Sequence, residues 1–165
     1  MSTAAPREPP REPPRSGGLY GTVLVLAVII ALTKSGHASS DIVLGGILVT
    51  SFVFWIVHVY ADTLATRVEF PARSWLDVAG EHASEEVGIL EAVIGPAIPL
   101  ILGVAGVLER ETAAWGAIGM GLIGLFGWGV AVGRALGYRR GGPILFGFLN
   151  VALGGLMVGL KVLVH

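Results

Sequence analysis

The run LGGILVTSFVFWIV, residues 44–57, decides the fold class of this chain. It carries no charged residue, and no polar stripe recurs along it at the 3.6-residue spacing of a helix with one wet face. The run at residues 145–160, LFGFLNVALGGLMVGL, has the same character. A soluble helical bundle needs such a stripe on each helix, whereas a helix in lipid does not. Both runs therefore predict membrane-spanning helices.

Five apolar runs, each bounded by charges, Gly or Pro, fill nearly everything after residue 18. A hydrocarbon layer about 30 Å thick takes roughly 20 helical residues to cross. Backbone polar groups inside it have to be bonded within the segment, which a helix achieves. We therefore predict an all-α, polytopic transmembrane helical bundle over residues 19–165. The expected spans are residues 19–33, 42–64, 87–108, 113–136 and 144–164.

Composition agrees with a membrane domain, since 53% of the 165 residues are hydrophobic and only 14% are charged. The absence of cysteine excludes disulfides, thiolate metal sites and a thiol nucleophile. Residues 1–18 repeat the tetrapeptide REPP and hold almost nothing apolar, which predicts a disordered cytoplasmic tail. A proline-rich ligand for an aromatic groove is the less favoured interpretation of this tail.

The distribution of Lys and Arg predicts the orientation. With the N-terminus inside, eight basic residues flank the spans on the cytoplasmic side and three on the outside, which the positive-inside rule favours. We expect a multi-pass protein of the bacterial cell membrane with an external C-terminus. Gly36-His37-Ala38 loosely resembles a signal cleavage site, so cleavage of the first span, leaving four, stays an alternative.

The polar connection at residues 71–86 predicts a short amphipathic cytoplasmic helix. Ser74 suits its N-cap, with Asp77 at the capping-box position. The apolar side chains of this helix are expected to rest on the headgroups while its acidic side chains and His82 face water.

Small residues predict how the spans pack, because helices in lipid associate where backbones can approach closely. Along residues 113–136 they recur every four positions, interrupted at Leu125, and residues 144–164 show a similar spacing at Gly147, Gly155 and Gly159. We expect these two spans to form an intimate antiparallel pair, with a second copy of the chain as the alternative occupant of the groove. The predicted packing residues are Ala117, Gly121, Gly129, Gly133, Gly155 and Gly159.

One set of ionisable residues is a candidate site. His58 and Asp62 lie four residues apart, hence on one helix face, toward the cytoplasmic end of their span. Glu91 lies about one turn inside the next span, at similar depth. Ionisable groups at such depth cost free energy unless they are paired or hydrated, so they are functional candidates by default. The sequence therefore predicts an ion or proton site at these three residues, with a purely structural role as the alternative.

Two prolines add to this hypothesis, because Pro96 and Pro99 leave the carbonyls of Ala92 and Gly95 without their helical donors. Free carbonyls beyond a carboxylate would suit a cation route in a broken helix. A metal bound by His58, Asp62 and a glutamate stays open, although no strong metal signature is present. No cofactor is expected.

Short segments resemble a family of small actinobacterial integral membrane proteins without established activity. The segments are Gly18-Leu19-Tyr20-Gly21, His58-Val59-Tyr60-Ala61-Asp62, residues 121–127 and Lys161-Val162-Leu163-Val164-His165. The resemblance spans most of residues 18–165 and implies a membrane location, but no catalytic residue.

No catalytic motif is recognisable, so we expect a protein that is not an enzyme. The favoured hypothesis is a membrane protein that acts through helix packing, as an accessory subunit or a homo-oligomer. The alternative is a small ion or proton translocator. The expected partners are the lipid bilayer and other membrane helices, and no nucleic acid.

Overall fold

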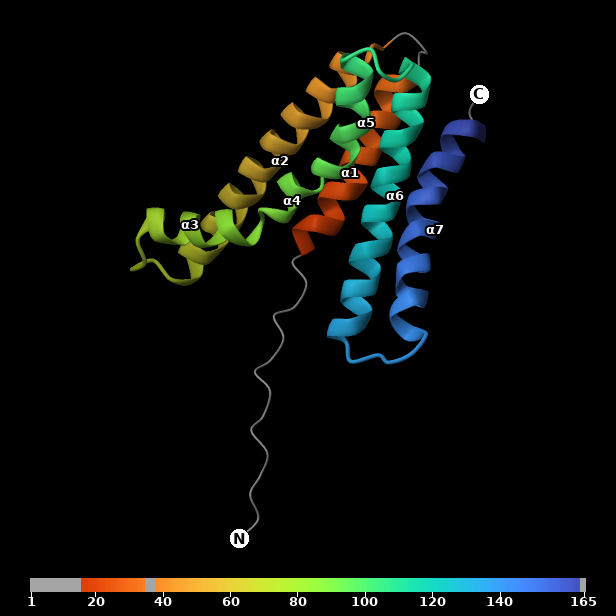
Figure 1. Cartoon of the computed structure of the whole chain (residues 1–165). Helices are drawn as coiled ribbons and strands as arrows, with labels where there is room; N and C mark the ends of the chain where they lie inside the picture. The colour runs from red at the N-terminus through yellow and green to blue at the C-terminus, as the bar shows by residue number, and fades with distance from the viewer. Residues whose placement is uncertain (1–15, 35–37, 164–165) are drawn as a thin grey trace.

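The computed structural model describes residues 16–34 and 38–163, and these are helical throughout, joined by short connections (Figure 1). The predicted all-α class is confirmed, because no strand occurs in the described ranges. The N-terminal tail expected at residues 1–18 lies almost entirely outside them. The helices are α1 (Ser16–Thr33), α2 (Ser40–Glu69), α3 (Trp75–Glu85), α4 (Gly88–Glu91), α5 (Ile94–Val104), α6 (Arg110–Ala135) and α7 (Gly142–Leu163).

Two helices, α2 and α6, are long and apolar enough to cross a membrane. A third crossing would result if the stretch Trp75–Glu91 and α5, which are bent by 48° at the break between them, counted as one span. The apolar stretches Gly17–Thr33 of α1 and Gly142–Leu156 of α7 are shorter. Two of the predicted spans are thus confirmed as helices of sufficient length and hydropathy.

The core forms around α1, which contacts α2, α4 and α6 (Figure 1). Three side chains of α1 are fully excluded from solvent: Val25, Leu26 and Ile29. They pack with buried side chains of α2, α5 and α6, among them Ile47 and Leu125. The first helix in the chain is therefore the centre of the bundle.

Helices α6 and α7 form the closest pair of the fold and run antiparallel, side by side (Figure 1). A Cβ atom at Gly129 would lie 2.4 Å from the Phe146 carbonyl oxygen, and one at Gly133 would lie 2.6 Å from the Cα of Pro143. Only glycine permits such an approach. The predicted antiparallel pair is confirmed, and the groove on α6 is filled within the chain.

The prediction for α7 holds at Gly147, where a Cβ would lie 2.7 Å from the Phe126 ring. It does not hold at Gly155 or Gly159, where no atom of the described residues lies within 4 Å of a placed Cβ. Gly154, which was not predicted, packs closely, since a Cβ there would lie 2.4 Å from Leu125. Neighbouring residues of a helix are rotated by roughly 100° about its axis. Gly155, which follows Gly154, therefore lies on a different face of α7.

Helix α3 begins close to where the sequence predicts. Ser74 is the N-cap residue, with φ −64° and ψ 136°, but its side chain makes no capping bond, so the predicted capping box is absent. The helix folds back along the C-terminal part of α2, with Val78 fully buried and Leu76 79% exposed. The prediction is therefore wrong for Val78, which packs on α2 rather than on the headgroups, whereas the exposed Leu76 and the exposed acidic side chains leave the rest of the predicted division open.

The segment predicted as the third span is broken after its first turn. Helix α4 ends at Glu91, and α5 begins at Ile94. Pro96 explains the position of this break, since it has no N–H to donate to the Ala92 carbonyl and its ring disfavours a continuous helix there. Within α5, Pro96 lies in the first turn, where a missing donor is tolerated.

The connections gather at two ends of the bundle (Figure 1). The end of α1, the start of α2 and the α5–α6 connection lie at one end, and the start of α1 and the α6–α7 connection lie at the other. Gly137 closes α6 with φ 79°, and the N–H of Tyr138 bonds to the Gly133 carbonyl at 3.1 Å. Gly137 thus has the left-handed backbone conformation that often ends a helix and that glycine adopts at little cost.

Candidate functional site

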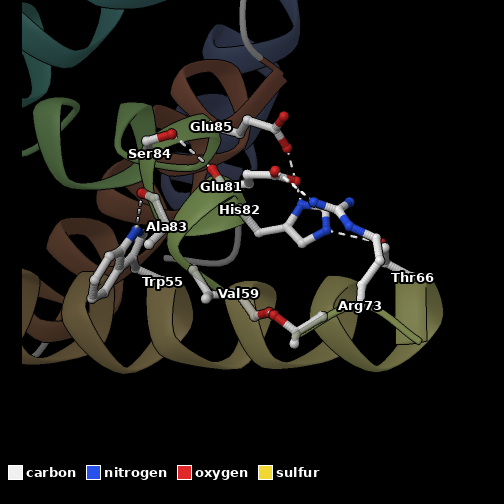
Figure 2. Close-up of polar contacts among 10 residues, drawn as sticks. Trp55, Val59, Thr66, Arg73, Glu81, His82, Ala83, Ser84 and Glu85 are labelled. Carbon is white, nitrogen blue, oxygen red and sulfur yellow. Dashed lines mark hydrogen bonds and ion pairs between the residues drawn. The ribbon is translucent and has the colours of Figure 1, made fainter. Parts of the chain in front are cut away.

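A polar cluster joins α3 to the C-terminal part of α2 (Figure 2). The His82 ring lies between two oxygens, with Nε2 2.9 Å from Thr66 Oγ1 and Nδ1 2.9 Å from Glu85 Oε2. The Trp55 indole N–H donates to the Ala83 carbonyl at 3.2 Å. Hydrogen bonds of this kind stabilise by about 1 kcal/mol each. The cluster therefore fixes α3 against α2, and His82, predicted to face water, is only 18% exposed.

Two arginines organise the turn that precedes α3. Arg67 donates to the carbonyls of Pro71 and Arg73, and Arg73 Nη2 lies 2.6 Å from Glu81 Oε1. The hydrogen bond from Arg73 lowers the pKa of the Glu81 carboxyl from its usual range, and the Arg73 charge adds to the effect. Both side chains are exposed, so solvent screens the pair. The pair shapes the turn without forming a binding site.

His58 and Asp62 make no contact that resembles a reaction site. The His58 Nδ1 lies 3.2 Å from the Phe54 carbonyl oxygen, and its ring lies 4.2 Å from the Phe54 ring. Within the described ranges, no hydrogen bond or ion pair joins Asp62 to another residue. A hydroxyl nearby on the chain, Ser51 Oγ, is buried and has no partner among the described residues. No catalytic Ser-His-Asp arrangement results.

Glu91 lies apart from these two residues. It lines a cavity of about 130 Å³ between α1, the α4–α5 break and α6, and neither His58 nor Asp62 contributes to that lining. In the part of the chain that the structure describes, no group of three His, Asp or Glu side chains is arranged to hold a metal ion. The three residues predicted to form one site are therefore not brought together.

Sequence reasoning missed the glycines that place α1 beside this cavity. A Cβ at Gly21 would lie 2.7 Å from the Cα of Ile89, and one at Gly88 would lie 2.7 Å from the Gly18 nitrogen. A Cβ at Gly18 would lie 1.7 Å from the Trp128 ring. The four-residue spacing from Gly17 to Gly21 is the signal that could have found this contact.

The cavity brings together the Glu91 carboxylate, the Thr22 hydroxyl and the Trp128 ring beside a helix break, and among the described residues it holds no assembled metal set. No protein-family model, curated protein or solved structure matches the chain significantly, so the site is interpreted from its own geometry.

Proposed function

We propose that this protein is an integral membrane protein that acts through helix packing, without catalysis, as an accessory subunit or homo-oligomer. The outer face of α2 carries the proposal. It leaves large apolar side chains uncovered along its length, an arrangement that water disfavours and lipid or a partner helix accepts. These side chains are Ile42, Leu48, Val49, Phe52, Val53, Ile56 and Val57.

We further propose five spans, with the N-terminus cytoplasmic and the C-terminus external, as in the family of small actinobacterial membrane proteins that the sequence resembles. The proposal is supported by charge: Arg67, Arg73, Arg134, Arg139 and Arg140 lie in or beside the connections assigned to the inside, and Lys34 and Arg110 beside those assigned to the outside. Cleavage of α1 is disfavoured by its place at the centre of the core.

Single cysteines test this topology, because the natural chain has none. We expect Ala72→Cys and Gly141→Cys to react with an impermeant maleimide only in inverted vesicles, and Val107→Cys to react in intact cells. The same side of labelling at all three positions would contradict the proposal, as would extraction of the protein by alkaline carbonate.

Packing through α2 predicts a pattern of cross-links. In native membranes, Val53→Cys on the outer face of α2 should give oxidised adducts, either with itself or with a second protein of defined mass. Ile123→Cys, an exposed apolar position on α6, is the matched control and should give far fewer. Equal yields at both positions, or none at several α2 positions, would count against an association face on α2.

Proton or cation translocation is a second candidate, favoured by the position of Glu91. Its carboxylate makes no hydrogen bond or ion pair with the described residues, although Glu91 directly precedes the α4–α5 break and lines a cavity. In proteoliposomes, flux should then be lost in Glu91→Gln and retained in His58→Ala and Asp62→Asn, which stand apart from the cavity. Wild-type vesicles without flux, despite proven incorporation, would exclude this function.

A further inference from the structure

The cavity beside Glu91 is lined by side chains from three parts of the fold. Thr22 comes from α1, Glu91 and Ala92 from the α4–α5 break, and Met120 and Trp128 from α6. Gly124 of α6 completes one wall, where a Cβ would lie 3.4 Å from Thr22 Cγ2. Residues distant in sequence thus line one half-open cavity of about 130 Å³, with the exposed Glu91 at its edge.

This lining is rich in hydrogen-bond acceptors and poor in donors. The Glu91 carboxylate only accepts when ionised, and Pro96 has no N–H for the Ala92 carbonyl. The Thr22 hydroxyl already donates to the Gly18 carbonyl at 2.7 Å, so its oxygen has only lone pairs left to offer. Among the described residues, no lysine or arginine lines the cavity. A guest that donates hydrogen bonds and carries positive charge would satisfy these groups.

The remaining walls specify what kind of cation fits. The indole of Trp128 is the best aromatic partner for an organic cation, and the Met120 thioether is soft and polarisable. A divalent metal needs several oxygen ligands, whereas a single carboxylate is present here. The volume of about 130 Å³ is close to that of an engineered cavity of about 150 Å³ that holds benzene, so it suits a guest of a few heavy atoms.

We propose that the cavity between α1, the α4–α5 break and α6 binds a small organic cation through its ammonium or guanidinium group, with Glu91 as the counter-ion and the Trp128 ring as its aromatic contact. The inference goes beyond helix packing and does not require transport, because binding is an equilibrium property of one chain. Its outcome is also independent of the labelling and cross-linking experiments above.

Calorimetric titration of the purified full chain in lipid nanodiscs tests the proposal. The probes are methylammonium, guanidinium and tetramethylammonium chlorides, compared with sodium chloride at equal ionic strength. We expect saturable binding of at least one organic cation and none of sodium. Glu91→Gln should weaken binding at least tenfold, while Glu111→Gln, an exposed carboxylate outside the cavity, should bind like the wild type. Glu91→Asp keeps the charge and should retain most of the affinity.

A second pair of variants tests the size of the cavity without changing charge. One variant narrows the cavity, and the other is its control. Gly124→Ala should lower the affinity for tetramethylammonium several-fold more than that for methylammonium, because the added methyl group projects toward Thr22. Gly127→Ala on the same helix meets no atom within 4 Å and should change neither. Unaltered affinity in folded Glu91→Gln, equal responses to sodium and organic cations, or no binding by the wild type would each overturn the proposal.

Discussion

The double replacement Gly129→Leu and Gly133→Leu is expected to separate α7 from α6 and to lower the free energy of unfolding by about 3 kcal/mol or more. At Gly129 a Cβ would already lie 2.4 Å from the Phe146 carbonyl oxygen and 2.7 Å from the Cα of Gly147. These are backbone atoms of α7, so no side-chain rotation can relieve the overlap. The expected measurement is an earlier unfolding transition in detergent, with new protease cleavage in the α6–α7 connection.

The matched control for this double variant lies on the same helix. Gly119→Leu and Gly127→Leu add the same side chains to α6 at positions where no atom lies within 4 Å. This control should change the unfolding free energy by much less, because the added side chains overlap no neighbour. Leucine also favours the helix over glycine, which opposes any loss of stability. Equal destabilisation by the two pairs would show that added bulk anywhere on α6, rather than overlap with α7, lowers the unfolding free energy.

Gly18→Ala and Gly21→Ala should both loosen α1 from the bundle, by about 1–3 kcal/mol each, but through different neighbours. At Gly18 the added methyl group would overlap the Trp128 ring, whereas at Gly21 it would meet the Cα and carbonyl of Ile89. Trp128→Leu should therefore remove most of the cost of Gly18→Ala and leave the cost of Gly21→Ala unchanged. Urea unfolding of the four-member cycles measures this coupling.

Gly45→Ala is the reference for these variants, since its Cβ would meet nothing within 4 Å and alanine favours a helix over glycine. It should leave stability unchanged or raise it slightly. If Trp128→Leu rescued both α1 variants equally, the tryptophan would be acting on the whole bundle rather than on its direct contact with Gly18.

The helical class and the pairing of α6 with α7 could be predicted because each depends on the spacing of residues along a single helix. Small residues at every fourth position of α6 mark where a neighbouring helix can approach closely, whichever helix that is. In the structure Gly121 meets Leu26 of α1, whereas Gly129 and Gly133 meet α7. On α7, however, glycines occur on more than one face, and spacing alone does not distinguish them. The structure uses the face with Pro143, Gly147 and Gly154 rather than the one with Gly155.

The candidate ion site failed to assemble for a related reason. Counting residues along a helix gives depth, and by that measure His58, Asp62 and Glu91 are level. It does not give rotation about the helix axis or the neighbour that each face meets. Glu91 lies on the side of α4 that meets the cavity with α1 and α6, and α2 adds nothing to that lining. The break before Pro96, by contrast, follows from a missing N–H and was predictable.

The central place of α1 has a consequence for biosynthesis. The ribosome makes α1 well before α6, yet Trp128, which covers Gly18, and Gly121, which receives Leu26, belong to α6. Helix α3 finds its partner α2 almost at once, because the two are neighbours in sequence. The part of the α1 surface that meets α6 therefore stays uncovered until α6 has been translated, and a truncated nascent chain that ends before α6 lacks part of its own core.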